Sequence, residues 1–314
     1  MTTFHHSEFA DVARLVAAKG KTVISLCVPT LNEEDTIGEV IRILKETLHD
    51  QSGLLDEVAV VDSGSTDRTR EVAAAAGADV YLASEILPEV GPAKGKGENI
   101  WKAGACLKGD IVCFVDGDVQ NMHPRFVLGT LGPLLFEDKL QYVKGYYDRP
   151  HAAVEVGVRP AGGGRVTEAL VRPLFSLFFP ELAELVQPLA GEYAMRRGVW
   201  ESLTMPTGYG VETAHLIDVL QGWGADAIGQ TDLDERRHRH QDTTSLGRMS
   251  FAVLHAFFRR AEAAGKLNLS APLTEQYRHF MRQDGVTRSI AWDFTDIERP
   301  PLREIPGYAR LRHR

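Results

Sequence analysis

Short apolar runs that alternate with helix-like stretches constrain the fold of this chain more than any other feature of its sequence. The runs recur in the first half of the chain, at residues 23–28, 58–61, 80–82 and 111–115. Stretches with helical character, such as residues 36–48 and 66–76, separate most of them. Short apolar runs are consistent with strands that are buried on both faces of a sheet. The alternation therefore predicts an α/β fold with a mainly parallel, Rossmann-like central sheet flanked by helices.

Polar motifs follow three of the predicted strands. They are Pro29-Thr30-Leu31-Asn32-Glu33-Glu34, Asp62-Ser63-Gly64-Ser65-Thr66-Asp67 and Asp116-Gly117-Asp118. Because the carboxyl ends of parallel strands meet at one edge of a sheet, these motifs predict a crevice that holds a base, a ribose and a diphosphate. The second motif is also typical of a turn that ends in a helix N-cap, which is the alternative for Ser65 and Thr66 more than for Asp62.

The Asp116-Gly117-Asp118 motif directly follows an apolar run that ends at Val115. Carboxylate oxygens at such a place are suited to a hard cation, Mg²⁺ or Mn²⁺, which takes its remaining ligands from water and from the phosphates of a substrate. The motif therefore predicts a site for a nucleoside diphosphate. The alternative is a polar exit from a strand, because Asp and Gly both favour turns.

The motifs together resemble those of a known enzyme family. In their order and spacing, the three strand-end motifs look like the nucleotide-sugar half of a GT-A glycosyltransferase. Four further motifs resemble those of the retaining glucosyl- and mannosyl-3-phosphoglycerate synthases: Pro92-Ala93-Lys94-Gly95-Lys96-Gly97-Glu98, Gly162-Gly163-Gly164-Arg165-Val166-Thr167-Glu168, Gln187-Pro188-Leu189-Ala190-Gly191-Glu192-Tyr193 and Gly208-Tyr209-Gly210-Val211-Glu212. The resemblance covers residues 22–240, and no motif is matched after them.

The resemblance implies a set of site residues. For the nucleotide sugar they are Pro29, Thr30, Leu31, Glu33, Asp62, Ser63, Lys96, Asp116, Gly117 and Glu212. For the acceptor, 3-phosphoglycerate, they are Gly164, Arg165 and Thr167; for the metal, Mg²⁺ or Mn²⁺, they are Asp118 and His238. Asp118, Glu212 and Arg165 are the expected catalytic residues. At His240 the sequence departs from the family, which has an amide side chain there.

Elementary chemistry supports some of these roles and offers alternatives to others. Glycines before a helix let backbone N–H groups surround an anion, and Arg165 can clamp a phosphate; a flexible connecting loop is the alternative. Lys96 can approach a diphosphate as a point charge. Without the resemblance, His238, which stands among arginines, would be read as a solvated surface residue. Glu212 is favoured in the first turn of a helix whatever its function.

Composition places limits on the protein. The 314 residues carry a formal net charge of −8, which argues against a general nucleic-acid surface. No apolar run is long enough to span a bilayer and the N-terminus has no signal-peptide pattern, so we expect a cytoplasmic protein that does not bind membranes. Cys27, Cys106 and Cys113 show no disulfide or metal spacing, and we expect all three to be buried small hydrophobes.

The predicted organisation has three parts. Residues 1–20 form a helical arm, and residues 21–240 form the GT-A catalytic domain, whose nucleotide-sugar half (about 21–120) precedes an acceptor half (about 121–240). Residues 241–314 form a helical C-terminal extension. Within it, apolar positions at Met249, Val253, Phe257 and Phe258 have helical spacing and predict a packing face, covered within the chain or by a second copy. The resemblance implies a homodimer.

The expected function is transfer of mannose from GDP-mannose to the 2-hydroxyl of 3-phosphoglycerate, with some glucosyl transfer. The alternative within the family is a glucosyl-3-phosphoglycerate synthase that uses UDP- or GDP-glucose. A sugar-phosphate nucleotidyltransferase shares the nucleotide crevice and the paired acids, but it usually has a glycine-rich loop and a basic residue near the first strand, which residues 29–33 lack. A nucleotide-sugar sensor without turnover is the third possibility.

Overall fold

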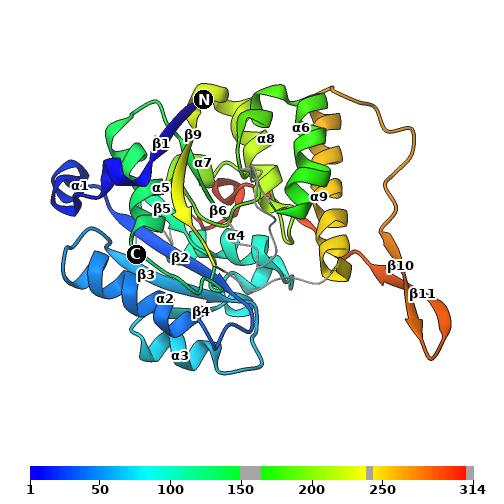
Figure 1. Ribbon diagram of the computed structural model, residues 1–314, viewed down its shortest axis with the longest axis horizontal. Coiled ribbons are helices and arrows are strands. Elements are labelled where there is room, and N and C mark those ends of the chain that lie inside the picture. The colour runs from blue at the N-terminus through cyan, green and yellow to red at the C-terminus, as the bar shows by residue number, and fades with distance from the viewer. Residues whose placement is uncertain (149–163, 238–242, 309–314) are drawn as a thin grey trace, which may run out of the picture.

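The computed structural model describes residues 1–148, 164–237 and 243–308, and its centre is an eight-stranded sheet (Figure 1). The strand order is β1-β9-β6-β7-β5-β2-β3-β4. All neighbouring pairs are parallel except those of β7, which runs antiparallel to both β5 and β6. The strands are β1 (Thr2–His5), β2 (Ile24–Thr30), β3 (Glu57–Asp62), β4 (Asp79–Leu82), β5 (Ile111–Phe114), β6 (Tyr142–Asp148), β7 (Tyr193–Arg196) and β9 (Ile228–Glu235). The predicted mainly parallel sheet is confirmed.

Successive residues of the central strands enter two separate cores, one on each face of the sheet. In β2, Leu26 and Val28 lie in one core and Cys27 lies in the other; in β3, Val60 and Val61 divide in the same way. Each of these side chains is fully buried. Because side chains alternate across a strand, burial on both faces requires the continuous apolar runs seen in the sequence.

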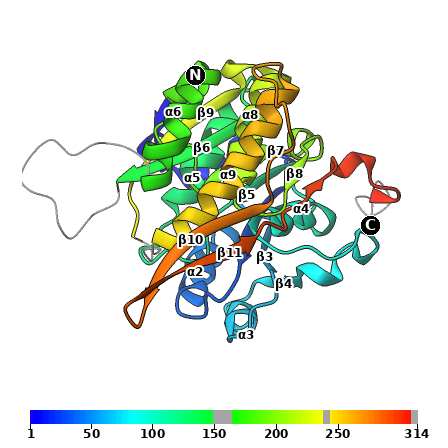
Figure 2. The ribbon, with the colours of Figure 1, turned by 90° about the vertical axis from the view of Figure 1, so that its right-hand side faces the viewer.

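Helices cover both faces of the sheet. They are α1 (Val12–Lys19), α2 (Ile37–Leu44), α3 (Thr69–Ala75), α4 (Lys96–Cys106), α5 (Arg125–Phe136), α6 (Arg172–Phe178), α7 (Arg197–Trp200), α8 (Val211–Trp223) and α9 (Thr243–Ala263). Buried residues of α1, α2, α3 and α5 belong to one core, and those of α4, α6, α7, α8 and α9 belong to the other. Figure 2 shows α6, α8 and α9 side by side on one face.

The N-terminal segment differs from the helical arm expected for residues 1–20. Its first residues form β1, which pairs in parallel with β9 at the edge of the sheet, and η1 (His6–Phe9) and α1 follow. In β1, exposed and partly buried positions alternate, as expected for an edge strand with one face on the core. Phe4 packs edge to face on Phe9, which is buried against α5.

The C-terminal segment is only partly helical, which corrects the expectation for residues 241–314. After α9, β10 (Gln276–Gln283) and β11 (Val286–Asp293) form an exposed antiparallel hairpin, which projects from the body in Figure 1. Asp284 and Gly285 form its two-residue turn, with φ of 52° and 76°. An Asp-Gly pair in this left-handed conformation is a strong hairpin signal. Finally β12 (Glu298–Arg299) pairs with β8 (Met205–Pro206).

The apolar face of α9 is covered within the chain. Val253 and Phe257 are fully buried, and the ring centroid of Phe257 lies 6.4 Å from that of Phe175 on α6 and 5.8 Å from that of Phe179. Val253 and Phe257 are therefore buried without a second copy of the chain, whereas Met249 and Phe258 are half-buried. Among the cysteines, Cys27 and Cys113 are buried as expected, whereas Cys106 is only half-buried. In the described parts of the chain, no helix has the length and apolar character needed to cross a membrane.

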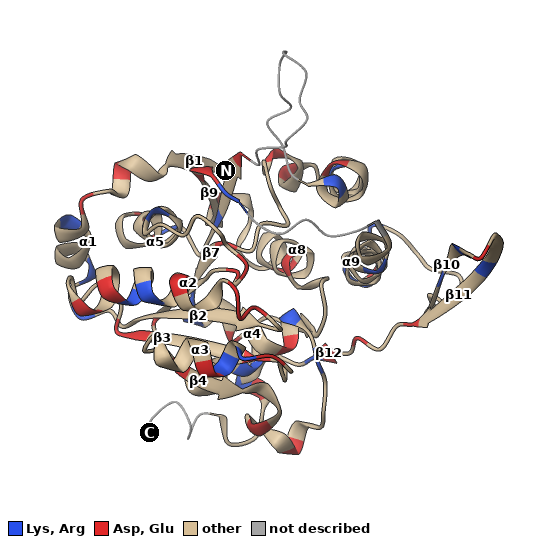
Figure 3. Ribbon diagram, turned by 60° about the horizontal axis from the view of Figure 1, so that its bottom comes forward, with Lys and Arg blue, Asp and Glu red and all other residues tan. Residues whose placement is uncertain are grey.

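Charged residues on the outer helices form exposed pairs. Lys or Arg positions lie next to Asp or Glu positions along α2 and α3 in Figure 3. Arg42 lies 2.7 Å from Glu39, and Arg68 lies 2.9 Å from Glu71. Exposed pairs of this kind contribute little to stability. A different set of charges, much less exposed, lies at the carboxyl edge of the sheet.

Candidate active site

The register of the central strands brings the predicted motifs to one edge of the sheet. Thr30 at the end of β2 lies opposite Asp62 at the end of β3, and Cys27 of β2 lies opposite Phe114 of β5. Asp116 therefore follows β5 at about the level where β2 ends. The segments that were predicted to form one crevice do lie together.

The two acids of the Asp116-Gly117-Asp118 motif are neutralised by basic residues from distant parts of the chain. Lys96 Nζ lies 2.7 Å from Asp116 Oδ1, while Arg236 Nη2 donates to Asp116 Oδ2 at 3.1 Å and to Asp118 Oδ1 at 2.8 Å. The acid side chains keep 23% and 27% of their surface exposed. Both carboxylates thus face solvent on one side and cations on the other.

The pKa shifts of the two acids follow from this arrangement. Burial raises the pKa of Asp116, but the charges of Lys96 and Arg236 outweigh it and hold that pKa well below the ordinary value. Burial raises the pKa of Asp118, and the Arg236 charge only partly offsets it. One acid is therefore firmly ionised, and the other gives up its proton less readily.

Arg236 joins the acids to the core beneath them. Its side chain is 3% exposed, and its Nε lies 3.2 Å from Oε1 of the fully buried Glu192. Its Nη1 donates to the hydroxyl of Tyr147 at 2.8 Å. Gly191, which directly precedes Glu192, has to be glycine, because a Cβ at this position would collide with the carboxylate of Asp116. The sequence did not predict a role for Arg236.

Lys96 lies between the carboxylate of Asp116 and that of Glu212. Its Nζ lies 2.7 Å from Oε1 of Glu212, which is buried in the first turn of α8, and 2.7 Å from Asp116. Burial lowers the pKa of Lys96, but the two carboxylates outweigh it and raise that pKa above its ordinary value. The structure thus brings together four of the predicted residues: Lys96, Asp116, Asp118 and Glu212.

A second lysine, which the sequence reading did not predict, lies under this group. Lys144 of β6 is almost fully buried, and its Nζ lies 4.5 Å from the ring centroid of Tyr193 and 5.7 Å from that of Tyr142. Burial lowers the pKa of Lys144 to about 7, although Glu212 acts against the shift. A lone lysine between tyrosines in the sequence gives no sign of this position.

Asp62 has a different environment from the other acids. It is fully buried, and its Oδ1 accepts hydrogen bonds from the backbone N–H groups of Gly64 at 2.9 Å and Ser65 at 2.7 Å. Its Oδ2 accepts from the hydroxyls of Thr30, at 3.1 Å, and of Ser65. These contacts tie the end of β2 to the loop after β3. Contact of Asp62 with a nucleotide stays a prediction.

Other predicted donor residues lie around these loops. Ser63 donates its hydroxyl to Asn99 Oδ1 at 2.7 Å, and the backbone N–H of Glu33 donates to Thr69 Oγ1 at 2.8 Å. The Gly117 carbonyl accepts a hydrogen bond of 2.7 Å from Thr36 Oγ1. Pro29 is buried in β2, whereas Leu31, directly after the strand, keeps 51% of its surface exposed. An exposed leucine at this edge is suited to contact with a flat ring, and that contact remains a prediction.

The predicted acceptor segment lies at the border of the described residues. Gly162 and Gly163 lie outside them, while the carbonyl of Gly164 accepts a hydrogen bond of 3.1 Å from Glu168. Arg165 is exposed, and Thr167, buried, begins η5 (Thr167–Val171). The role of these residues toward an acceptor stays a prediction, as does the metal role of His238, which also lies outside the described residues.

The C-terminal segment supports the helix that presents Lys96. Arg299 of β12 makes a bidentate pair with the buried carboxylate of Glu98 on α4, at 2.8 and 2.9 Å. Trp101 of α4 donates to the carbonyl of Pro300 at 2.8 Å. No site residue was expected after residue 240, yet this segment fixes the helix that begins with Lys96. Such a pairing of residues 201 positions apart has no local signal in the sequence.

Comparison with known proteins identifies the family and the fold of this chain. Residues 25–150 match the profile of the family described as Glycosyl transferase family 2. Glucosyl-3-phosphoglycerate synthase of Petrotoga mobilis is 46% identical over 308 residues, which cover 98% of this chain and 94% of that relative. The similarity thus extends past residue 240, where the motif resemblance ended.

Solved structures show the same fold. Mannosyl-3-phosphoglycerate synthase from Rubrobacter xylanophilus superimposes with a TM-score of 0.89 at 36% identity, and the match covers 97% of each chain. Glucosyl-3-phosphoglycerate synthase from Mycobacterium tuberculosis, solved in complex with Mn²⁺, uridine-diphosphate-glucose and phosphoglyceric acid, superimposes with a TM-score of 0.83 at 39% identity. That match covers 96% of this chain and 98% of the other. The GT-A fold expected from the motifs is confirmed.

Proposed function

Because this chain belongs to the family of glucosyl- and mannosyl-3-phosphoglycerate synthases, we propose that it transfers glucose from a nucleoside diphosphate glucose to the 2-hydroxyl of 3-phosphoglycerate. Glucose replaces mannose, the donor expected first, because the relative from Petrotoga mobilis is named a glucosyl-3-phosphoglycerate synthase. The M. tuberculosis enzyme, named likewise, has been solved with uridine-diphosphate-glucose and phosphoglyceric acid. UDP-glucose is therefore the donor to test first.

The observation that carries the proposal is the alternation of charge at the carboxyl edge of the sheet. Lys96 lies between Asp116 and Glu212, and Arg236 lies on the other side of Asp116, between it and Asp118. A diphosphate needs positive charge, and sugar hydroxyls need buried acceptors beside it. Within one site, Lys96 can supply the positive charge and the acids on either side of it can supply the acceptors.

The residues at this edge fit a divalent metal. The carboxylates of Asp116 and Asp118 are partly exposed, and oxygen ligands of this type suit Mg²⁺ or Mn²⁺. Asp118 and His238 are the expected metal ligands. When bound, the cation would supply Lewis acid stabilisation to the departing diphosphate. Arg236 already compensates the two acids in this structure, which shows that the corner takes up positive charge.

The remaining chemistry falls to residues of the chain. Breaking the bond between the anomeric carbon and the diphosphate oxygen builds negative charge, which Lys96 is placed to neutralise. Glu212 accepts hydrogen bonds from donor hydroxyls. Retention, which the family implies, fits attack by the acceptor oxygen on the face that the diphosphate leaves, and the diphosphate takes the acceptor proton. Among the described residues, no further carboxylate stands out as a nucleophile for the opposite face.

Arg165 is proposed as the clamp for the acceptor phosphate. Replacement Arg165→Ala should raise the KM for 3-phosphoglycerate about tenfold or more and leave the KM for the donor within about twofold, because a bidentate charged contact to phosphate is lost. Steady-state kinetics with each substrate varied in turn measures both constants. Arg42→Ala, which removes an exposed arginine of α2, is the control. Equal changes in the two KM values would move Arg165 out of the acceptor site.

Transfer of mannose is the second candidate, and the TM-score of 0.89 with the mannosyl enzyme favours it. The deciding experiment compares kcat/KM for UDP-glucose, GDP-glucose and GDP-mannose at fixed 3-phosphoglycerate. We expect a glucose donor to be preferred, with some mannosyl transfer, because Glu212 can pair with hydroxyls of either epimer. A preference for GDP-mannose above about 100-fold, or nearly 3 kcal/mol, would assign the protein to the mannosyl enzymes instead.

The products separate the other classes of function. Release of a nucleoside diphosphate indicates a glycosyltransferase, release of pyrophosphate indicates a nucleotidyltransferase, and binding without turnover indicates a sensor.

The homodimer that the family resemblance implies also stays a proposal. Sedimentation velocity of the full chain would test it, and a single species with the mass of one chain would contradict it.

A further inference from the structure

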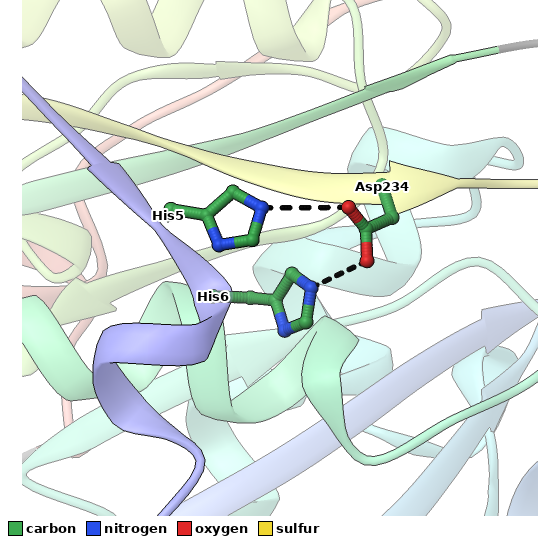
Figure 4. Close-up of side chains that lie close together, drawn as sticks. All are labelled: His5, His6 and Asp234. Carbon is green, nitrogen blue, oxygen red and sulfur yellow. Dashed lines mark hydrogen bonds and ion pairs between the residues drawn. The ribbon is translucent and has the colours of Figure 1, made fainter.

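Two histidines and one aspartate converge at the edge of the sheet formed by β1 and β9. His6 Nε2 lies 2.6 Å from Asp234 Oδ2, and His5 Nε2 lies 3.4 Å from Asp234 Oδ1. The two imidazole rings are tilted by 37° with their centroids 4.5 Å apart. Figure 4 shows both rings pointing at the same carboxylate from the N-terminal segment, while the aspartate comes from the end of β9. None of these residues takes part in the candidate active site.

The backbone holds the three side chains in place. β1 pairs with β9 so that His5 lies opposite Asp232, two residues before Asp234. Asp234 has a φ of 63°, which is uncommon for a residue with a side chain, and its N–H donates to Asp232 Oδ1 at 3.0 Å. His5 begins a capping box with Glu8. Three ligating groups are thus positioned by paired strands and a helix cap, not by a flexible tail.

Ser7 orients the first imidazole. Its hydroxyl lies 2.7 Å from His5 Nδ1, so Nε2 is the nitrogen that faces Asp234. Metal binding through Nε2 requires the ring proton on Nδ1, and the Ser7 hydroxyl is placed to accept it. The hydrogen bond of 3.3 Å that the Ser7 backbone N–H donates to Nδ1 is then given up. One ligand atom from each of His5, His6 and Asp234 can be chosen so that all three lie within 4.8 Å of one another. Ligands around a tetrahedral zinc ion are about 3.4 Å apart, given metal–ligand bonds of about 2.1 Å, so small side-chain rotations close the site.

We propose that His5, His6 and Asp234 bind a divalent transition-metal ion of the zinc type. Two neutral imidazoles and a carboxylate suit Zn²⁺, Co²⁺ or Ni²⁺, whereas Mg²⁺ prefers oxygen ligands alone. The side chains of His5 and Asp234 are about half exposed, which leaves room for entry of the ion and for a water as a further ligand. The bound ion cross-links the N-terminal segment to β9, and Arg236 follows this strand by one residue. The site is independent of the proposed sugar transfer.

The test is a zinc titration of the full chain without an affinity tag, after chelation and in excess Mg²⁺. Wild type should bind one more equivalent of Zn²⁺ than the double variant H5Q/H6Q. Zn²⁺ should raise the melting temperature of wild type and leave that of H5Q/H6Q unchanged. The matched control is H49Q, because His49 also pairs with a carboxylate, that of Asp50 at 2.7 Å, but with one imidazole. H49Q should behave as wild type.

A second measurement identifies the ligands. With Cu²⁺ as probe, electron paramagnetic resonance of wild type should show coupling to two imidazole nitrogens, which H5Q/H6Q loses. The variant D234N, which keeps both rings, should lose the extra zinc equivalent as well, and it stands in if the double variant fails to fold. Equal zinc stoichiometry in wild type, H49Q and D234N would overturn the proposal, and the cluster would then be an ion pair alone.

Discussion

The acid that ends β3 and the acids that follow β5 lie at the same edge of one sheet, yet they have opposite surroundings. Asp62 is fully buried and accepts four hydrogen bonds from neutral backbone and hydroxyl donors, while one half-exposed cation, Arg70, lies 3.6 Å from its Oδ1. Asp116 and Asp118 are partly exposed and face the cations Lys96 and Arg236. The first acid has its oxygens occupied by hydrogen bonds within the fold, and the other two pair with cations and keep part of their surface open to a ligand.

This contrast separates a structural role from a chemical one. Neutral donors around a buried carboxylate cannot leave without exposing unsatisfied groups, so Asp62 holds the shape of the crevice. The carboxylates of Asp116 and Asp118 are partly exposed, so a metal ion or a phosphate can bind beside the buried cations that already pair with them. A strand-end aspartate therefore has to be judged by the charge of its partners and not by its position alone.

The largest expected effect is the loss of activity on Asp118→Ala. Because this change removes a proposed metal ligand while Arg236 keeps its pairs with Asp116 and Glu192, kcat/KM should fall about a thousandfold and the melting temperature should stay within about 2 °C. Steady-state assays and thermal unfolding of the same preparation measure the two quantities. Near-normal turnover in the folded variant would remove Asp118 from the chemistry.

Asp62→Ala should mainly lower the stability of the fold, in contrast to Asp118→Ala, which should mainly lower activity. It leaves two backbone N–H groups and two hydroxyls of the crevice without their acceptor, so the free energy of unfolding should fall by about 3 kcal/mol. Urea denaturation followed by circular dichroism measures the change, and Asp62→Asn, which keeps some acceptor capacity, should lose less. If Asp62→Ala unfolded like wild type but failed to bind nucleotide, the contrast drawn here would be wrong.

The last expected effect, small over any one pH unit, concerns the dependence of stability on pH and the buried Lys144. The pKa of this lysine is about 7 in the folded protein and about 10.4 in the unfolded chain, so folding releases a proton between these values. Below pH 7 the ammonium is charged in both states and its burial destabilises the fold fully. As the pH rises from 7 to 10 the folded state loses this charge first, and the free energy of unfolding gains up to about 1 kcal/mol per pH unit.

Lys144→Met should lack this gain. The difference in unfolding free energy between wild type and variant should thus change between pH 7 and 10 and stay constant from pH 5 to 6. Urea denaturation at each pH measures it. A difference that does not vary with pH would place the lysine in a better solvated environment than the structure gives it.

The sequence predicted the nucleotide half of the fold well, because its signals are local. The apolar runs at residues 58–61 and 80–82 lie within β3 and β4, and the helical pattern at residues 36–48 corresponds to α2 and the π-helix η2 (Lys45–Asp50). The antiparallel β7 between β5 and β6 could not be predicted, since its partners are set by long-range pairing. The hairpin turn at Asp284-Gly285 did have a local signal, which the expectation of an all-helical extension passed over.

The residues of the candidate site also differ in whether a local sequence signal could predict them. Residues in contiguous motifs, such as Asp116 and Glu212, could be found from the sequence. Arg236, Lys144 and Arg299 could not, because each acts through a partner more than 60 residues away, and a buried charge is recognised only when its partner is known. Sequence patterns indicate which acids end strands, and only the fold shows which cations meet them.

The most direct test of the central claim is the dependence of sugar transfer on a divalent cation at the Asp116–Asp118 corner. Metal-free protein is supplied with UDP-glucose and 3-phosphoglycerate, Mn²⁺ is titrated, and release of UDP is measured for wild type, Asp118→Ala and Asp62→Asn. We expect wild type to need Mn²⁺ and 3-phosphoglycerate together, Asp118→Ala to stay inactive at every Mn²⁺ concentration that activates wild type, and Asp62→Asn to keep the wild-type Mn²⁺ dependence. Full activity of the chelated wild type, or a shifted Mn²⁺ requirement in Asp62→Asn with none in Asp118→Ala, would contradict the account.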